Sequence, residues 1–261
     1  MSPDQAFRLM DMLTLDGDVY ATDPNAQVLI NGIGTIAGTP MDDPSVWDHV
    51  HIGEGVPNFP EVDTSAFEGF ATNIVDADTI TSGDKKFTNI RIKAGTNPTF
   101  ANGAKLDGVV FIEQPNQVTF AEGTTITGVI CTDGTSTLSK DNQIKFELNT
   151  HSYGVDALPD TAEFHELRQM TGSFILAPDF TVRFENESGV INGMIAAGHV
   201  KFENSFHGTL CGGILSYSTV EIMAENMSDF TIDHSKYGGV PSGFNVDKPR
   251  LVPDSSTYTE H

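Results

Sequence analysis

A short phrase centred on glycine recurs along the middle of this chain. It runs aliphatic, any residue, glycine, any residue, then aliphatic or aromatic, and its clearest copies are Leu106–Val110 and Ile126–Ile130. Successive copies lie 18 to 26 residues apart, the weakest being that around Gly154, and the glycines are Gly108, Gly128, Gly154, Gly172, Gly193 and Gly212. Because a unit of this length cannot bury its own apolar face, neighbouring units must stack to share a core. The phrase therefore predicts a repeat protein that grows along one axis.

An aromatic residue precedes five of the six glycines. These residues lie eight to ten positions upstream, and they are Phe100, Phe120, Phe146, Phe184 and Phe202. A short polar turn such as Asn102-Gly103 follows most of them, and Gly and Asn tolerate the positive φ that a tight corner requires. Since side chains alternate along a strand, we expect each repeat to be strand, corner, strand, corner. The aromatic residues should then point inward and stack along the axis.

These features predict an all-β chain folded as a single-stranded, right-handed parallel β-helix, a solenoid of about six or more coils. Coils of such a solenoid stack about 4.8 Å apart. The Leu-x-x-Leu-x-Leu pattern of leucine-rich repeats is missing, and so is the six-residue aliphatic period of left-handed hexapeptide helices. An antiparallel β-sandwich is the alternative, and it predicts hairpin turns and no fixed glycine register.

The repeat divides the chain into three stretches. Residues 1–86 lack it, and there a capping box at Ser2–Gln5 followed by the apolar segment Ala6–Leu13 predicts a helix. We expect that N-terminal helix to cap the open end of the solenoid, ahead of a loop-rich region that leads into the repeats. Residues 87–235 carry the repeats, and residues 236–261 are rich in Pro, Ser and Thr and predict a C-terminal tail.

One insertion interrupts the repeats at residues 160–170. The segment opens with the spacing of a capping box, and its apolar residues Phe164, Leu167 and Met170 fall on one face of a helix. The insertion therefore predicts a lateral helix that leans on the solenoid.

The chain is strongly acidic, with 36 Asp and Glu against 14 Lys and Arg and a net charge of -22. Nucleic acids and anionic membranes are therefore poor partners, and acidic polysaccharides are disfavoured for the same reason. The charge would keep a strand-rich rod soluble and discourage edge-to-edge association. No stretch approaches the roughly 18 apolar residues of a membrane span. We expect an extracellular or cell-surface location, directed by an export signal that lies outside this chain, and a cytosolic protein is the alternative.

The two cysteines, Cys131 and Cys211, are too few for a disulfide framework. The predicted register places them four coils apart, roughly 19 Å, which exceeds the reach of a disulfide. Neither has a basic neighbour in the sequence that would stabilise a thiolate. We therefore expect two free cysteines that serve as packing residues.

One short element raises the alternative of a polysaccharide-active β-helix enzyme, either a hydrolase or a lyase. Arg91-Ile92-Lys93 matches the Arg-x-Lys element with which polygalacturonase-type hydrolases bind a sugar carboxylate. In those enzymes an Asp pair and a Gly-His-Gly come earlier in the chain, whereas here Asp42-Asp43 lies outside the repeat and Gly198-His199 follows Arg91. Hydrolysis also needs two carboxylates at a fixed separation. We therefore expect no enzyme activity and no catalytic residues, with Arg91 and Lys93 as a solvated pair on a strand.

A candidate metal site lies in the N-terminal region. His49 and His51 are two residues apart and would share one face of an extended segment, with Glu54 close by. Three such ligands can form a zinc site, although no fourth ligand is identifiable and surface histidines are the alternative. So acidic a surface also suits weak calcium binding, and no other cofactor is expected.

Three stretches of the chain resemble a known group of bacterial proteins. The stretches are Phe67–Asp76, Phe87–Phe100 and Ala157–Phe174. They are similar to exported, pilin-like (PilX-like) proteins that are encoded with type IV pilus assembly genes and carry a C-terminal β-helix of unknown function. The resemblance covers about residues 14–235. It implies a pilus-associated surface protein with pilin-like partners, and it carries over no activity and no catalytic residue.

Together these observations predict a non-catalytic extracellular or cell-surface module with a structural or adhesive role, pilus-associated by resemblance. Its expected partners are pilin-like proteins or surface glycans. A glycan- or ice-binding module is a further alternative, and it would require a regular threonine ladder on one flat face. Thr99 and Thr119 begin such a ladder, but later coils do not continue it.

Overall fold

Strands dominate the fold. The computed structural model describes residues 5–15, 17–21, 24–53, 60–101, 103–134, 138–217, 223–224, 229–233 and 240–245. Strands make up 54% of the structure, and one 16-stranded sheet curls through 268° as a half-barrel. The described residues also form a short α-helix and three 3-10 turns: α1 (Ser65–Glu68), η1 (Pro44–His49), η2 (Val155–Ala157) and η3 (Leu167–Gln169). The prediction of an all-β chain is confirmed.

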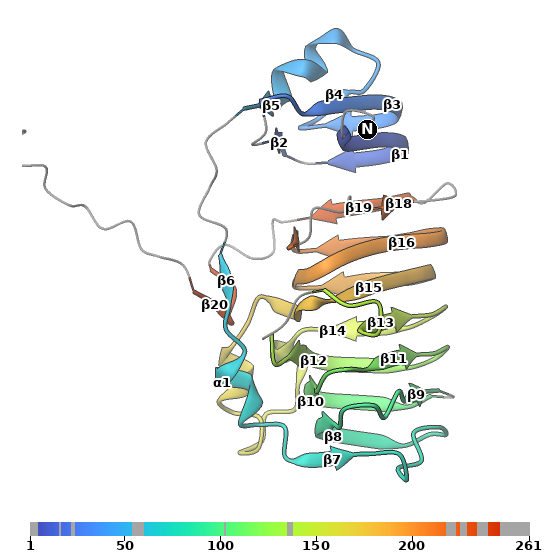
Figure 1. Cartoon of the computed structure of the whole chain (residues 1–261), viewed down its shortest axis with the longest axis vertical. Coiled ribbons are helices and arrows are strands. Elements are labelled where there is room, and N and C mark those ends of the chain that lie inside the picture. The colour runs from blue at the N-terminus through green and yellow to red at the C-terminus, as the bar shows by residue number, and fades with distance from the viewer. Residues whose placement is uncertain are drawn as a thin grey trace, which may run out of the picture.

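The long sheet is a stack of mostly parallel strands (Figure 1). From one end to the other its path is β7 (Asn73–Val75), β8 (Lys86–Ile92), β10 (Lys105–Ile112), β12 (Thr125–Thr132), β15 (Ser173–Asn192), β16 (Met194–Cys211), β19 (Asp229–Asp233), β1 (Gln5–Leu15), β3 (Gln27–Ile36) and β4 (Thr39–Pro40). Each pairing from β7 to β3 is parallel, and β4 at the end runs antiparallel to β3.

Shorter strands extend the stack beside this path. They are β9 (Thr99–Phe100), β11 (Gln117–Phe120), β13 (Gln143–Phe146), β14 (His151–Tyr153), β17 (Ile214–Ser216) and β18 (Met223–Ala224). Two small sheets are separate from the stack. One pairs β2 (Val19–Ala21) with β5 (Val50–Ile52), and the other pairs β6 (Glu61–Val62) with β20 (Phe244–Asn245).

Strand pairing brings neighbouring repeats into register. Lys105–Ile112 pairs residue for residue with Thr125–Thr132, so Gly108 lies beside Gly128. The strands that follow the corners pair as well, β9 with β11 and β11 with β13. Each repeat thus adds one layer to two walls of the sheet. This parallel pairing differs from the antiparallel hairpins that a β-sandwich would show.

The aromatic residues expected to point inward form a column in the core. All are buried, and strand pairing places each beside the next: Phe100, Phe120, Phe146, Phe184 and Phe202. Successive rings stack with centroids 4.7 to 5.6 Å apart and interplanar angles of 9 to 27°. Stacked rings at this spacing attract one another beyond the burial of their area. The column therefore stabilises the part of the stack from β9 to β16.

A second apolar layer lies on the outer face of the sheet. Phe111, Cys131 and Leu176 lie in one outward column. Three segments from distant parts of the chain cover them: the α1 segment, the 155–170 segment and the segment that contains β20. Figure 1 shows α1, β6 and β20 along this flank. We call this group of residues the outer apolar layer.

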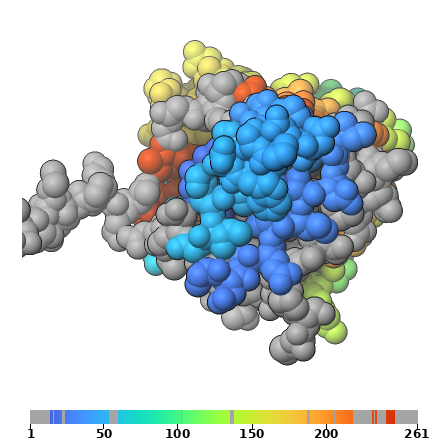
Figure 2. Space-filling view, turned by 90° about the horizontal axis from the view of Figure 1, so that it is seen from above, coloured from blue at the N-terminus to red at the C-terminus, as the bar shows by residue number. Residues whose placement is uncertain are grey.

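The N-terminal segment is a strand, so the prediction of a capping helix is wrong. Part of the expected capping box lies outside the described residues, and Ala6–Leu13 belongs to β1. β1 pairs with β3 at ten positions and with β19, near the other end of the chain, at three. Hydrogen bonding to two neighbouring strands outweighs a local helical preference, which is weak. The N-terminal region still covers an end of the stack, as the blue residues of Figure 2 show.

The 160–170 insertion is a series of turns, so the prediction of a lateral helix is also wrong. Most of its backbone hydrogen bonds join residues three apart, and its one regular element is η3. Bonds of that type close tighter turns with poorer geometry than an α-helix, so such runs stay short. Phe164 and Leu167 are nevertheless buried in the outer apolar layer, and Met170 is partly buried there.

Part of the expected C-terminal tail is folded. Of residues 236–261 the structure describes 240–245, where Phe244 and Asn245 form β20 against β6. Phe244 packs against the outer apolar layer. The prediction of a tail is therefore wrong for this segment, because the partly buried Phe244 side chain packs against the outer apolar layer in a Gly- and Pro-rich sequence.

Candidate functional site

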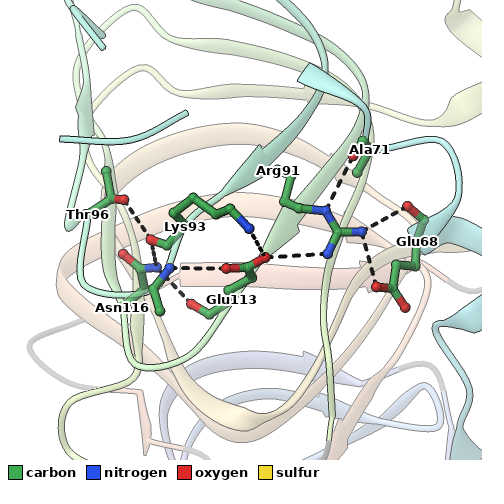
Figure 3. Close-up of polar contacts among 8 residues, drawn as sticks. Glu68, Ala71, Arg91, Lys93, Thr96, Glu113 and Asn116 are labelled. Atoms are coloured by element: carbon green, nitrogen blue, oxygen red, sulfur yellow. Dashed lines mark hydrogen bonds and ion pairs between the residues drawn. The ribbon is translucent and has the colours of Figure 1, made fainter. Parts of the chain in front are cut away.

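Arg91 is the centre of a polar network on the flank of the stack (Figure 3). It lies on β8 beside Phe111 of β10, with the guanidinium 4.4 Å from the ring centroid. Nη2 lies 3.1 Å from the Glu68 carboxylate and donates to the Glu68 carbonyl at 3.3 Å, and Nε donates to the Ala71 carbonyl at 3.4 Å. Glu68 ends α1 and Ala71 follows it. Arg91 therefore fastens the α1 segment to the sheet.

Glu113 and Lys93 extend this network (Figure 3). Lys93 Nζ lies 2.8 Å from Glu113 Oε1, and Arg91 Nη1 lies 3.5 Å from the same oxygen. Burial acts to raise the pKa of Glu113, but hydrogen bonds from Lys93, the Ala94 amide and Arg91 outweigh it, and the pKa is lowered. The Asn116 side-chain amide donates to the carbonyls of Lys93 and Glu113 at 2.8 and 2.7 Å. Glu113 is therefore an ionised carboxylate held between two cations.

The Arg-x-Lys element makes intramolecular ion pairs in this geometry. Arg91 and Lys93 do lie together, but the carboxylate between them belongs to Glu113 of the same chain. The Arg91 side chain is only 19% exposed, so the prediction of a solvated residue is wrong for Arg91, whereas Lys93 is 47% exposed. A sugar carboxylate could reach both cations only by displacing Glu113.

The other residues considered for an enzyme lie elsewhere. Asp43 caps η1, because its carboxylate accepts hydrogen bonds from the Ser45 amide and hydroxyl at 2.9 and 2.8 Å. His199 is buried on β16. Arg91 lies on the second strand from the β7 end, whereas η1 contacts β3 and β4 at the opposite end. The structure does not bring these elements into one site.

A second ion-pair network crosses three layers of the wall formed by β13, β15 and β16. Strand pairing places Lys145, Arg183 and Lys201 in one outward column. The contacts form one continuous series, which is Glu147–Lys145 at 3.0 Å, Lys145–Glu185 at 3.1 Å, Glu185–Arg183 at 3.3 Å, Arg183–Glu203 at 2.6 Å and Glu203–Lys201 at 3.9 Å. We call these six residues the charge ladder. It has three positive and three negative charges, in a chain whose net charge is -22.

The charge ladder was missed in the sequence, although a signal for it exists. The three strands share an aliphatic, cation, Phe, Glu motif, which reads Ile144-Lys145-Phe146-Glu147, Val182-Arg183-Phe184-Glu185 and Val200-Lys201-Phe202-Glu203. Alternate residues of a strand face the same side, so an inward Phe places the cation and the Glu together on the outer face. Stacking in register then brings the charges of neighbouring repeats together.

Five of the six phrase glycines have positive φ, between +95° and +155°: Gly108, Gly128, Gly172, Gly193 and Gly212. A Cβ at Gly128 would overlap the carbonyl oxygen of Gly108, and a Cβ at Gly212 would overlap that of Gly193. At these positions the missing side chain lets adjacent layers approach. Gly154 is the exception, because its φ is −67° and it is the N-cap of η2.

An asparagine occupies the corresponding position one layer toward β7. Asn89 has a φ of +47°, and its Oδ1 accepts a hydrogen bond from the Val109 amide at 3.0 Å. Asn tolerates positive φ better than other residues with a side chain. The segment Phe87–Ile90 therefore takes the place of the phrase in this layer, with Asn in place of Gly and one residue fewer, since Val110 pairs with Ile90.

The histidines considered as metal ligands converge on a different carboxylate. His49 Nδ1 lies 2.8 Å from Asp18 Oδ1, and His51 Nε2 lies 2.9 Å from Asp18 Oδ2. The other ring nitrogen of His49 lies 3.1 Å from Thr39 Oγ1. Hydrogen bonds from His51 and His49 lower the pKa of Asp18. Glu54, the third expected ligand, lies outside the described residues.

This cluster joins elements of the N-terminal region. Asp18 precedes β2, His51 is on β5 and His49 ends η1, while Tyr20 of β2 stacks on His51 with ring centroids 4.5 Å apart. Within the described part of the chain, no group of three or more His, Cys, Asp or Glu side chains is arranged to hold a metal ion. The contacts instead fasten η1 and β5 to β2.

One buried carboxyl group lies at a corner of the stack. Asp179 Oδ1 accepts a hydrogen bond from Thr132 Oγ1 at 2.7 Å, while Oδ2 is buried without a partner among the described residues. Burial raises the pKa of Asp179, and the charge of Asp133 acts in the same direction. Asn142 beside it is also buried, and its side-chain amide donates to the Asp179 carbonyl at 3.4 Å. Nothing in the local sequence marks Asp179 as a buried residue.

The two cysteines are free, and they lie closer together than predicted. Cys131 pairs with Leu176, Leu176 with Ala196, and Ala196 with Leu215 in the same repeat as Cys211. They are therefore three layers apart instead of four, about 14 Å along the axis, which still exceeds the reach of a disulfide. Burial raises the pKa of Cys131, whereas Cys211 is partly exposed.

Among the described residues, no helix is long and apolar enough to cross a membrane. No family model, curated protein or solved structure matches the chain.

Proposed function

We propose that the chain is a right-handed parallel β-helix that serves as a non-catalytic structural or adhesive module on the cell surface, associated with type IV pili. The observation that carries the proposal is the charge ladder. Its charged groups pair with one another across three layers, and their side chains are 10 to 36% exposed. A network of partly shielded pairs stabilises more than isolated surface pairs do. The clustered charge of this wall thus holds the stack together.

The rest of the structure supports the same role. Arg91 and Glu113 fasten a lateral segment to the stack, and the aromatic column fills its interior. Hydrogen bonds between parallel layers run along the axis, so each added repeat extends the same ladder. An elongated body with this continuous bonding suits a spacer or support that presents a surface away from its anchor.

The alternative of an ice- or glycan-binding face has less support. Thr99 pairs with Thr119, but the same column continues with Lys145, Arg183 and Lys201. Threonine therefore occupies two adjacent rungs of this column, and charged residues occupy the next three. A regular threonine array would need the later rungs as well.

A polysaccharide panel tests the proposal against the enzyme alternative. The protein is incubated with neutral and uronic-acid polysaccharides, and reducing ends and unsaturated products are measured. We expect no product above the buffer control. Lys93→Ala is the informative variant, because Lys93 is half exposed, whereas loss of Arg91 would also release the α1 segment. Cleavage that Lys93→Ala abolishes without lowering the melting temperature would overturn the proposal.

Protease treatment of intact cells tests the proposed location. A surface module should be digested on intact cells and should co-purify with pili sheared from them. Protection on intact cells, followed by digestion after lysis, would place the protein inside the cell and refute the surface role.

A further inference from the structure

The described residues between 5 and 53 form a cap with its own internal contacts. β1 pairs with β3 at ten positions, and β2 pairs with β5. Among the side chains that the structure describes, buried Val19, Ile36, Met41 and Val46 form a hydrophobic cluster separate from the two clusters of the remaining chain. The contacts of Asp18 with the two histidines also lie within this region. We call these residues the cap, and the described residues between 60 and 245 the rod.

The cap and the rod are joined by a short strand pairing at the end of the stack. Leu13, Thr14 and Leu15 of β1 pair with Phe230, Thr231 and Ile232 of β19. β1 lies next to β19 in Figure 1, and the cap covers that end in Figure 2. Without the cap, this edge of β19 would present unpaired backbone groups, which are a template for another strand. The junction is thus a strand edge of the rod that the cap covers.

We propose that this junction also forms between chains, so that the cap of one copy covers β19 of a second copy. The paired residues make the same contacts whichever chain supplies the cap, as in any exchange of an identical element. What favours a chain's own cap is the tether, which gives an effective concentration on the order of millimolar for a short connection. The exchanged form therefore becomes populated where the local concentration of chains approaches this effective concentration, as among copies anchored close together on a surface.

The length of the connection limits the arrangement of the partners. Residues 54–59 lie outside the described part of the chain, and a connection of six residues spans at most about 24 Å. Two exchanging copies must therefore lie side by side. Reciprocal exchange closes a dimer, whereas one-way exchange continues along a row of copies.

Paired cysteines provide the test, because Thr14 and Thr231 lie opposite each other in the junction. Adjacent strands bring such residues within disulfide range. In a full-length background of Cys131→Ala and Cys211→Ser, one preparation carries Thr14→Cys and a second, of different mass, carries Thr231→Cys. The two are refolded together from denaturant, concentrated to about 1 mM, the scale of the tether, and oxidised. We expect a covalent heterodimer whose yield falls on dilution.

Thr35→Cys replaces Thr14→Cys in the matched control. Thr35 pairs with Thr14 on β3, one strand further from β19, and two strand spacings of about 9.6 Å are too far to bridge. We expect a heterodimer yield at least tenfold above this control. A yield equal to the control would overturn the proposal.

The double variant Thr14→Cys/Thr231→Cys separates two causes of failure. At micromolar concentration it should form a bridge within one chain. If it does so while the mixed single variants do not cross-link, the junction exists but is not exchanged, and the proposal is wrong. If the double variant forms no bridge, the junction itself is wrong and the proposal falls with it. Neither result bears on the function proposed for the rod.

Discussion

Replacing Gly128 with alanine perturbs the stack where two layers are closest. Gly128 has a φ of +143°, which a residue with a side chain adopts at a cost of about 1–3 kcal/mol. The new Cβ would also overlap the Gly108 carbonyl oxygen, a backbone atom in the middle of the paired strands β10 and β12. Relief requires the strands to separate locally, with one or two ladder hydrogen bonds lost at about 1 kcal/mol each. The expected loss of unfolding free energy is roughly 2–5 kcal/mol.

Urea and thermal unfolding measure this loss. In a chain of this size 1 kcal/mol shifts the melting temperature by about 2–4 °C, so the midpoint should fall by roughly 4–20 °C. Gly95→Ala is the matched control, because Gly95 has a φ of +74° and nothing lies within 4 Å of the added Cβ. It should cost only the backbone strain, about 1–2 kcal/mol. If Gly128→Ala were no less stable than Gly95→Ala, the contact between Gly108 and Gly128 would be refuted.

Three further predictions follow from single contacts. Phe146→Ala should cost roughly 3–5 kcal/mol of unfolding free energy, because its ring is buried between Phe120 and Phe184; a cost below about 1 kcal/mol in urea would place the ring at the surface. Glu185→Gln should lower the unfolding free energy by about 1–2 kcal/mol at low salt and by less in 1 M NaCl, because it weakens contacts with Lys145 and Arg183. Glu122→Gln, in an exposed turn, is the control and should not change the unfolding free energy. Asp179→Asn should raise the melting temperature relative to wild type at pH 7. Burial raises the folded pKa of Asp179 above its ordinary value of 3.8, so ionisation of Asp179 destabilises the wild type as the pH rises through the folded pKa. The difference in melting temperature between Asp179→Asn and wild type should therefore shrink at pH 4, and a difference that stays the same would contradict this.

Periodic features were the predictable part of this structure. A feature that recurs once per repeat stacks on its own copies, so the contact of Gly108 with Gly128 and the column of Phe residues follow from spacing. The charge ladder was predictable in the same way, because its cations and glutamates flank the Phe of each repeat. Asn89 has the positive φ of the phrase glycines, but its segment does not match the phrase, because it is one residue shorter and Arg91 follows Ile90.

Contacts between distant segments were not predictable from local sequence. Ala6–Leu13 has an apolar pattern that suits a helix, but its conformation depends on pairing with β3 and with β19, more than 200 residues away. His49 and His51 meet Asp18 because β2 pairs with β5, about thirty residues further along. Arg91 meets Glu68 because α1 folds back on the sheet. In each case tertiary pairing decides the outcome, and local preference is too weak to indicate it.

The repeats stack in register as parallel layers. The distance between spin labels at Thr99 and Lys201, measured by double electron–electron resonance, tests this stacking. Both residues face outward in one column, separated by Thr119, Lys145 and Arg183. Four layers at about 4.8 Å each predict a backbone separation near 19 Å and a single narrow distribution. A distance above about 30 Å, or several distances of similar weight, would contradict the stacking, because no column of in-register layers at that spacing could contain both positions.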